Sequence, residues 1–194
     1  MTPSSPSWRP RVIIFDLLTA LLDSWSLWDA STPSATAAEG RIWRARYLEL
    51  TFSTGAYIPY EQLVHQAAKD PWPEDAQVLE QLRLRGYKLG VVTNCSKRLG
   101  TIAADIVGKF DSIVTAEESG FYKPTEQAYQ AILTKMGVQS QEALFVAGSA
   151  GDVEGATNAG MKVVWHNKVG LSRKGESVPL KEATRLDDAL SGFM

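Results

Sequence analysis

Short apolar runs alternate with amphipathic segments along most of this chain. Five runs rich in β-branched or aromatic residues have the length and pattern of strands buried on both faces. They are Val12 to Phe15, Lys88 to Thr93, Ser112 to Thr115, Ala143 to Ala147 and Lys162 to Trp165. Residues 74–85, 97–108 and 125–136 carry apolar side chains at helical spacing. This alternation predicts an α/β fold, a doubly wound parallel sheet with helices on both faces.

Residues 24–73 do not follow this alternation. They hold four of the six tryptophans, at positions 25, 28, 43 and 72. A strong helical pattern covers residues 41–52, and the linker-like stretch ASTPSATAA precedes it. We interpret 24–73 as a small helical cap inserted after the first strand. The expected division is then a flexible tail at 1–10, an α/β core at 11–23 and 74–194, and the cap between the two core pieces.

Composition narrows the choice of partners. A net charge of −2 gives no electrostatic case for nucleic acid or an anionic membrane. No apolar segment approaches the ~20 residues of a membrane span, and the N-terminal MTPSSPSWRP does not resemble a secretory signal. The single cysteine, Cys95, excludes an intrachain disulfide and fits a reducing compartment. We therefore expect a cytoplasmic protein.

One acid, Asp16, interrupts the first apolar stretch, RVIIFDLLTALLDSW. Because an unpaired buried charge is costly, Asp16 either caps a helix, joins a buried ion pair, or ends the strand at the rim of the sheet. Ligands of parallel sheets bind outside the carboxyl ends of the strands. Two further predicted strands end in polar residues, at Thr93-Asn94 and in the loop from Gly148 to Asp152. The pattern therefore places polar groups where this architecture binds ligands.

Four segments, in order, resemble the four motifs of the haloacid dehalogenase superfamily: VIIFDLLTALLDS, VVTN, GFYKP and VAGSAGDVEGATNAGM. The stretch WRARYLELTF is similar to the cap helix of the L-2-haloacid dehalogenases. The resemblance implies that Asp16 is a nucleophile whose ester is later cleaved by water. It implies that Lys123 lies beside Asp16 and keeps it ionised. Thr93 and Asn94 would then hydrogen-bond the nucleophile or the leaving group.

The same resemblance suggests further site residues. Asp152 would orient Lys123 or the hydrolytic water, although Asp152 is also a candidate helix cap. Arg44 in the cap would bind a substrate carboxylate or the departing halide, because a guanidinium suits a carboxylate. Tyr129 matches a tyrosine of the dehalogenase site or serves packing, and Trp25 is a candidate for the pocket entrance. His166 is isolated, and we interpret it as structural or exposed.

Two departures argue against a phosphatase. Superfamily phosphatases carry an acid two residues after the nucleophile, whereas this chain has Leu18, which cannot protonate a leaving group. They also hold Mg²⁺ with an Asp where this chain has Gly148, before Ser149. A halide needs neither a general acid nor a metal to leave. The expectation is therefore an enzyme without a cofactor, with Mg²⁺ disfavoured. The resemblance also implies a small-molecule substrate, and it leaves a monomer or a homodimer open.

The dehalogenase pattern is also incomplete. Leu18, Thr19 and Ala20 replace a usual Tyr-Gly-Thr, so Thr19 is a candidate substitute for the missing hydroxyl. Ser149 stands where the dehalogenases carry Asn, and smaller residues flank it. We expect a roomier and more apolar pocket, lined in part by Leu18, Thr19 and Ser149. Four functions stay open. The first is hydrolysis of a 2-haloacid, and the second is a non-hydrolytic reaction (dehydration, isomerisation or cyclisation) with Asp16 as general base. The third is phosphatase activity, and the fourth is a catalytically silent binding protein.

Overall fold

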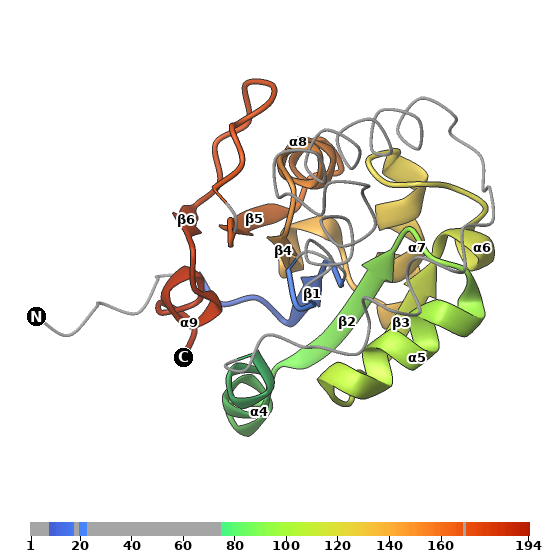
Figure 1. The fold of residues 1–194 in the computed structure, drawn as a ribbon, viewed down its shortest axis with the longest axis horizontal. Helices are drawn as coiled ribbons and strands as arrows, with labels where there is room; N and C mark the ends of the chain where they lie inside the picture. Colours follow the sequence, from blue (N-terminus) through green and yellow to red (C-terminus); the bar gives the residue numbers. More distant parts are fainter. Residues whose placement is uncertain (1–7, 18–19, 23–74, 169) are drawn as a thin grey trace, which may run out of the picture.

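The computed structural model describes residues 8–17, 20–22, 75–168 and 170–194 (Figure 1). The predictions for the cap insertion at 24–73, and with it Trp25 and Arg44, lie outside the described residues. Those for Leu18 and Thr19 lie outside them as well. The described residues therefore form the α/β core.

In the described part of the chain, six parallel strands form one sheet in the order β3-β2-β1-β4-β5-β6 (Figure 1). The strands are β1 (Val12–Phe15), β2 (Lys88–Thr93), β3 (Ser112–Thr115), β4 (Ala143–Ala147), β5 (Lys162–His166) and β6 (Lys181–Ala183). The five predicted strands are confirmed, and β5 extends by one residue to His166. The strand β6 was not predicted, because this short edge strand reads Lys-Glu-Ala and has no apolar run.

The predicted helices are confirmed to within one residue at each end. They are α4 (Asp75–Leu84), α5 (Lys97–Val107) and α7 (Glu126–Met136). Gly137 ends α7 in the left-handed conformation at φ 66°, which favours glycine. The structure adds α6 (Ala116–Ser119), η1 (Ser140–Glu142), α8 (Ala150–Asn158) and α9 (Leu186–Ala189). None of the helices in the described ranges has both the length and the apolar character needed to cross a bilayer.

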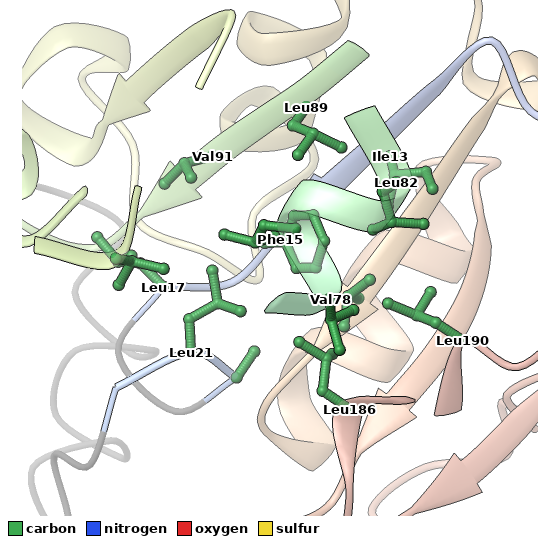
Figure 2. Packing of buried hydrophobic residues seen from close by; sticks show 14 of the residues in the cluster. Ile13, Phe15, Leu17, Leu21, Val78, Leu82, Leu89, Val91, Leu186 and Leu190 are labelled. Atoms are coloured by element: carbon green, nitrogen blue, oxygen red, sulfur yellow. The ribbon is translucent and has the colours of Figure 1, made fainter. Parts of the chain in front are cut away.

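Helices pack on both faces of the sheet, as the alternation predicts. Figure 2 shows one face, where Ile13 and Phe15 of β1 lie in a buried cluster with residues of α4 and α9. On the other face Ile14 of β1 belongs to a second buried cluster, together with residues of α7 and α8. Burying each large apolar side chain contributes about 1.5–3 kcal/mol. Because β1 is buried on both faces, it is a rigid support for the residue that follows it, Asp16.

The N-terminal boundary needs a correction. The Pro- and Ser-rich composition predicts a flexible tail over residues 1–10. Residues 1–7 lie outside the described residues, but Trp8 packs on the core. The Trp8 ring meets Phe193 edge-on with centroids 6.3 Å apart, and Lys162 Nζ lies 4.1 Å from the centroid of the same ring. Local composition cannot indicate these partners, because they come from distant parts of the chain.

Candidate active site

The order of the strands places a topological switch point beside β1. From β1 the chain adds β2 and then β3 on one side, and it returns to add β4 on the other side. Connections after β1 and β4 therefore diverge, which opens a crevice at the carboxyl edge in sheets of this type. Asp16 directly follows β1, and the loop leading to Asp152 directly follows β4.

A buried lysine joins these two carboxylates. Lys123 lies in the connection between α6 and α7, and its Nζ donates to Asp16 Oδ1 at 2.7 Å and to Asp152 Oδ2 at 3.1 Å. The Lys123 residue is 2% exposed and Asp16 is 6% exposed. The ammonium also lies 5.6 Å from the centroid of the Phe145 ring, within the range of a cation–π interaction.

Asn94 holds the backbone of Lys123 at two points. Its Nδ2 donates to the Lys123 carbonyl at 3.0 Å, and its Oδ1 accepts from the Lys123 amide at 2.7 Å. The family resemblance implies that Asn94 hydrogen-bonds the nucleophile or the leaving group. The structure places both of these bonds on the loop that carries the lysine. Thr93 is buried, and its Oγ1 lies 3.2 Å from Cys95 Sγ.

Asp152 is held by hydroxyl groups as well as by the lysine. Tyr129 Oη donates to Asp152 Oδ1 at 2.8 Å, and Ser149 Oγ donates to Oδ2 at 3.1 Å. Ser149 also caps α8, because its hydroxyl accepts from the Asp152 amide at 3.2 Å. The alternative that Asp152 is the helix cap is therefore wrong: Asp152 lies in the first turn, and Ser149 precedes the helix.

A backbone amide orients the other oxygen of Asp16. The N–H of Ala20 donates to Asp16 Oδ2 at 3.2 Å, and Ala20 is buried. In the sequence, Ala20 stands out only because it lacks the hydroxyl group that the dehalogenases carry there. No residue type could signal this contact, because every residue except proline has an N–H.

The electrostatics of the site follow from burial and from this pairing. Burial alone would lower the pKa of Lys123, but the Asp152 and Asp16 carboxylates together raise it above its ordinary value. Burial, followed by the charge of Asp152, raises the pKa of Tyr129 well above its ordinary range. Lys123 is therefore an ammonium and Tyr129 a neutral hydrogen-bond donor at neutral pH.

Five predicted site residues lie in one connected network: Asp16, Lys123, Asp152, Ser149 and Tyr129. Asn94 supports this network because its side chain hydrogen-bonds the backbone of Lys123. The catalytic roles of these six residues stay predictions. Within the described ranges, no group of three or more His, Cys, Asp or Glu side chains could hold a metal ion.

Two curated relatives align with this chain over about two thirds or more of its length. An (S)-2-haloacid dehalogenase of Pseudomonas putida is 26% identical over 190 residues, covering 80% of this chain and 84% of that protein. A phosphatase of Mycobacterium tuberculosis is 33% identical over 131 residues, covering 66% of this chain and 60% of that protein.

The fold matches solved structures of the same group. A crystal structure of an L-2-haloacid dehalogenase superposes with a TM-score of 0.81 at 24% identity, covering 94% of this chain and 98% of that chain. The family model for the haloacid dehalogenase-like hydrolases matches residues 20–160, which include Lys123, Tyr129 and Asp152. With well over half of its residues matched, the chain belongs to the haloacid dehalogenase-like hydrolase family.

Proposed function

We propose that this protein is a metal-independent hydrolase that removes halide from a small or moderately apolar 2-haloacid, with Asp16 as the nucleophile. The observation that supports this most strongly is the contact of 2.7 Å between Asp16 and the buried ammonium of Lys123. An ammonium at this distance favours the ionised form of a carboxylate, which is the nucleophilic form.

In the proposed reaction, an oxygen of Asp16 attacks the carbon that carries the halogen. A carbon–oxygen bond forms while the carbon–halogen bond breaks, and the halide leaves with the bonding electron pair. Water then adds to the ester carbonyl, which expels the 2-hydroxy acid, releases a proton and restores the Asp16 carboxylate. Splitting one displacement into two steps is the advantage of a covalent intermediate.

Lys123 carries the electrostatic part of this mechanism. While Asp16 is ionised, Lys123 neutralises it, and when Asp16 is esterified, the ammonium still has Asp152 as a partner at 3.1 Å. The buried cation is therefore never left without a carboxylate during the cycle. Tyr129 and Ser149 hold Asp152 in place for this purpose, so they act as positioning residues.

The donor set does not fit Mg²⁺. This cation demands near-octahedral oxygen coordination, usually from one or two carboxylates with waters and substrate. Here the Lys123 ammonium lies between the two carboxylates, and Asp152 also accepts hydrogen bonds from Tyr129 and Ser149. Gly148 supplies no side-chain oxygen. We therefore derive no step through a metal, and a leaving halide requires none.

Substrate contacts from the remaining predicted residues belong to the same proposal. Arg44 would bind the carboxylate of the haloacid, because its guanidinium can donate two parallel hydrogen bonds. Leu18, Thr19 and Trp25 would line the pocket. All four residues lie outside the described ranges, so this part of the proposal rests on the sequence.

Chloride release from 2-chloropropionate tests the proposal directly. We expect chloride and lactate in equal amounts, with a rate that EDTA does not change and that Asp16→Asn abolishes. One turnover in ¹⁸O-labelled water should place the label in the Asp16 carboxylate. Chloride release no faster than that of the Asp16→Asn variant would remove simple dehalogenation from consideration.

The phosphatase relative calls for a parallel assay with p-nitrophenyl phosphate and Mg²⁺. We expect no phosphate release above the Asp16→Asn background. Metal-dependent phosphate release without chloride release would replace the proposal with a phosphatase assignment.

A further inference from the structure

His166 is a polar residue in apolar surroundings close to the candidate site. It is the last residue of β5 and is 0% exposed. Side chains alternate between the faces of a strand, so His166 lies on the same face as Val164, two residues earlier. Val164 belongs to the buried cluster that also contains Ala20, Leu21 and Leu22. His166 therefore meets the segment that follows Asp16.

The imidazole bonds to the backbone of that segment. His166 Nδ1 lies 2.5 Å from the carbonyl oxygen of Ala20, a residue 146 positions earlier in the chain. A carbonyl oxygen only accepts hydrogen bonds, so Nδ1 carries the proton and donates. Burying an imidazole is costly unless it is hydrogen-bonded, and this bond offsets part of that cost.

Both backbone polar groups of Ala20 therefore form hydrogen bonds. Its carbonyl accepts from His166, and its N–H donates to Asp16 Oδ2 at 3.2 Å. Its methyl side chain cannot supply a polar anchor of its own. Because the N–H and C=O of one residue belong to different peptide groups, the link from His166 to Asp16 is positional rather than electronic.

We propose that His166 is a positioning residue for Asp16, and that it acts by fixing the Ala20 amide against the carboxylate. This inference rests on the proposed function in so far as Asp16 is taken as the nucleophile. Lys123 holds Oδ1 of Asp16 and Ala20 holds Oδ2, so the two bonds together restrict rotation of the carboxylate. An attacking group restricted to the reactive geometry lowers the entropic part of the barrier.

A matched pair of variants separates positioning from general packing. His166→Asn keeps an N–H near the position of Nδ1, whereas His166→Leu has a similar branched shape and no polar atom. With 2-chloropropionate we expect His166→Leu to lower kcat by about tenfold at a nearly unchanged KM. We expect His166→Asn to recover most of kcat. Should His166→Leu fail to fold, His166→Gln serves in its place, because its N–H lies near the Nε2 position instead.

The amide proton of Ala20 provides a second readout that needs no substrate. In the wild-type protein its NMR signal should lie downfield, because the amide donates to a carboxylate, and Asp16→Asn should move it upfield. We expect His166→Leu to move it in the same direction, while His166→Asn leaves it near the wild-type position.

The two readouts distinguish the two proposals. If the wild-type protein releases no chloride but the Ala20 signal moves as expected, the proposed function fails and the positioning role stands. If Asp16→Asn moves the Ala20 signal and His166→Leu does not, the positioning role is overturned whatever the enzyme hydrolyses. Equal losses of kcat in His166→Asn and His166→Leu would also overturn it, because they would mark a packing role.

Discussion

The ammonium nitrogen of Lys123 lies 2.7 Å from Oδ1 of Asp16, although the two residues are 107 positions apart in the chain. The fold brings them together because β1 is central in the sheet and the connection carrying Lys123 is held to the end of β2 by Asn94. Burial makes this pair sensitive to change, since a charge that loses its partner inside a protein is strongly destabilising.

Replacing Lys123 by Met should lower both stability and activity. The variant leaves the buried carboxylates of Asp16 and Asp152 without their shared cation, and we expect unfolding to require about 3–5 kcal/mol less at pH 8. Uncompensated burial raises the pKa of a carboxyl group in the folded state above its unfolded value, so the loss should shrink as the pH falls toward the unfolded value. Urea unfolding at several pH values measures this.

The double variant Lys123→Met with Asp152→Asn is the control for that experiment. It removes one of the two uncompensated charges, so it should regain part of the lost stability without regaining chloride release. A single Lys123→Met variant as stable as the wild-type protein at pH 8 would contradict the buried ion pair described here.

Asn94→Ala should reduce activity by misplacing Lys123. The variant loses the bonds to both the amide and the carbonyl of Lys123, and we expect a cost of about 1–3 kcal/mol in the free energy of unfolding together with a lower kcat. Asn94→Asp keeps the acceptor for the Lys123 amide but not the donor for its carbonyl. The kcat of Asn94→Asp should fall between those of the wild-type protein and Asn94→Ala. A kcat equal to the wild-type value in Asn94→Ala would show that the Asn94 side chain is not needed to place Lys123.

Gly155→Ala should disturb the contact between α8 and the loop that carries Lys123. A Cβ at this position would lie 2.6 Å from Pro124 Cβ and 2.8 Å from the Pro124 carbonyl oxygen, closer than real contacts allow. We expect a net loss of about 1–3 kcal/mol in unfolding free energy, although Ala is intrinsically better than Gly in a helix by about 1 kcal/mol. Thermal or urea unfolding, with chloride release alongside, checks this.

The exposed Asn158, on the same helix, offers a comparison. Asn158→Ala should change the unfolding free energy by less than about 0.5 kcal/mol. If Gly155→Ala proves as stable as Asn158→Ala, the close approach of α8 to Pro124 is less restrictive than the structure indicates.

Stability should fall in alkaline solution, and Tyr129 should contribute to the fall. Its pKa is raised well above the ordinary 10.0 in the folded protein, chiefly by burial and then by Asp152. Above that ordinary value the unfolded chain releases the proton while the folded protein keeps it, so the free energy of unfolding decreases as the pH rises. Lys123 acts in the same sense above its ordinary 10.5, because its folded pKa is also raised.

The variant Tyr129→Phe removes the Tyr129 proton and leaves only that of Lys123, so it separates the two contributions. Its unfolding free energy should fall less steeply above pH 10, by up to about 1.4 kcal/mol per pH unit. Urea unfolding between pH 9 and pH 11 gives the two slopes. Identical slopes in the variant and the wild-type protein would show that Tyr129 does not contribute this proton.

Much of the fold followed from local pattern. The run from Val12 to Phe15 indicates a strand buried on both faces, and the helical spacing of residues 125–136 indicates a helix buried on one face. The period of the apolar positions therefore predicts the type of element. The polar residues at the strand ends, together with the motif that contains Lys123, pointed to one edge of a parallel sheet. The edge strand β6 escaped prediction because its pattern carries no such signal.

By itself, then, the sequence determined the layered α/β core and the set of polar residues at its carboxyl edge. Only the tertiary structure decided how these residues pair: Asn94 with the backbone of Lys123, Ser149 as the cap of α8, and His166 with the carbonyl of Ala20. The reason is physical. Periodicity along a chain reports how much each residue is buried, whereas a hydrogen bond depends on which distant segments the packed sheet brings within about 3 Å of each other.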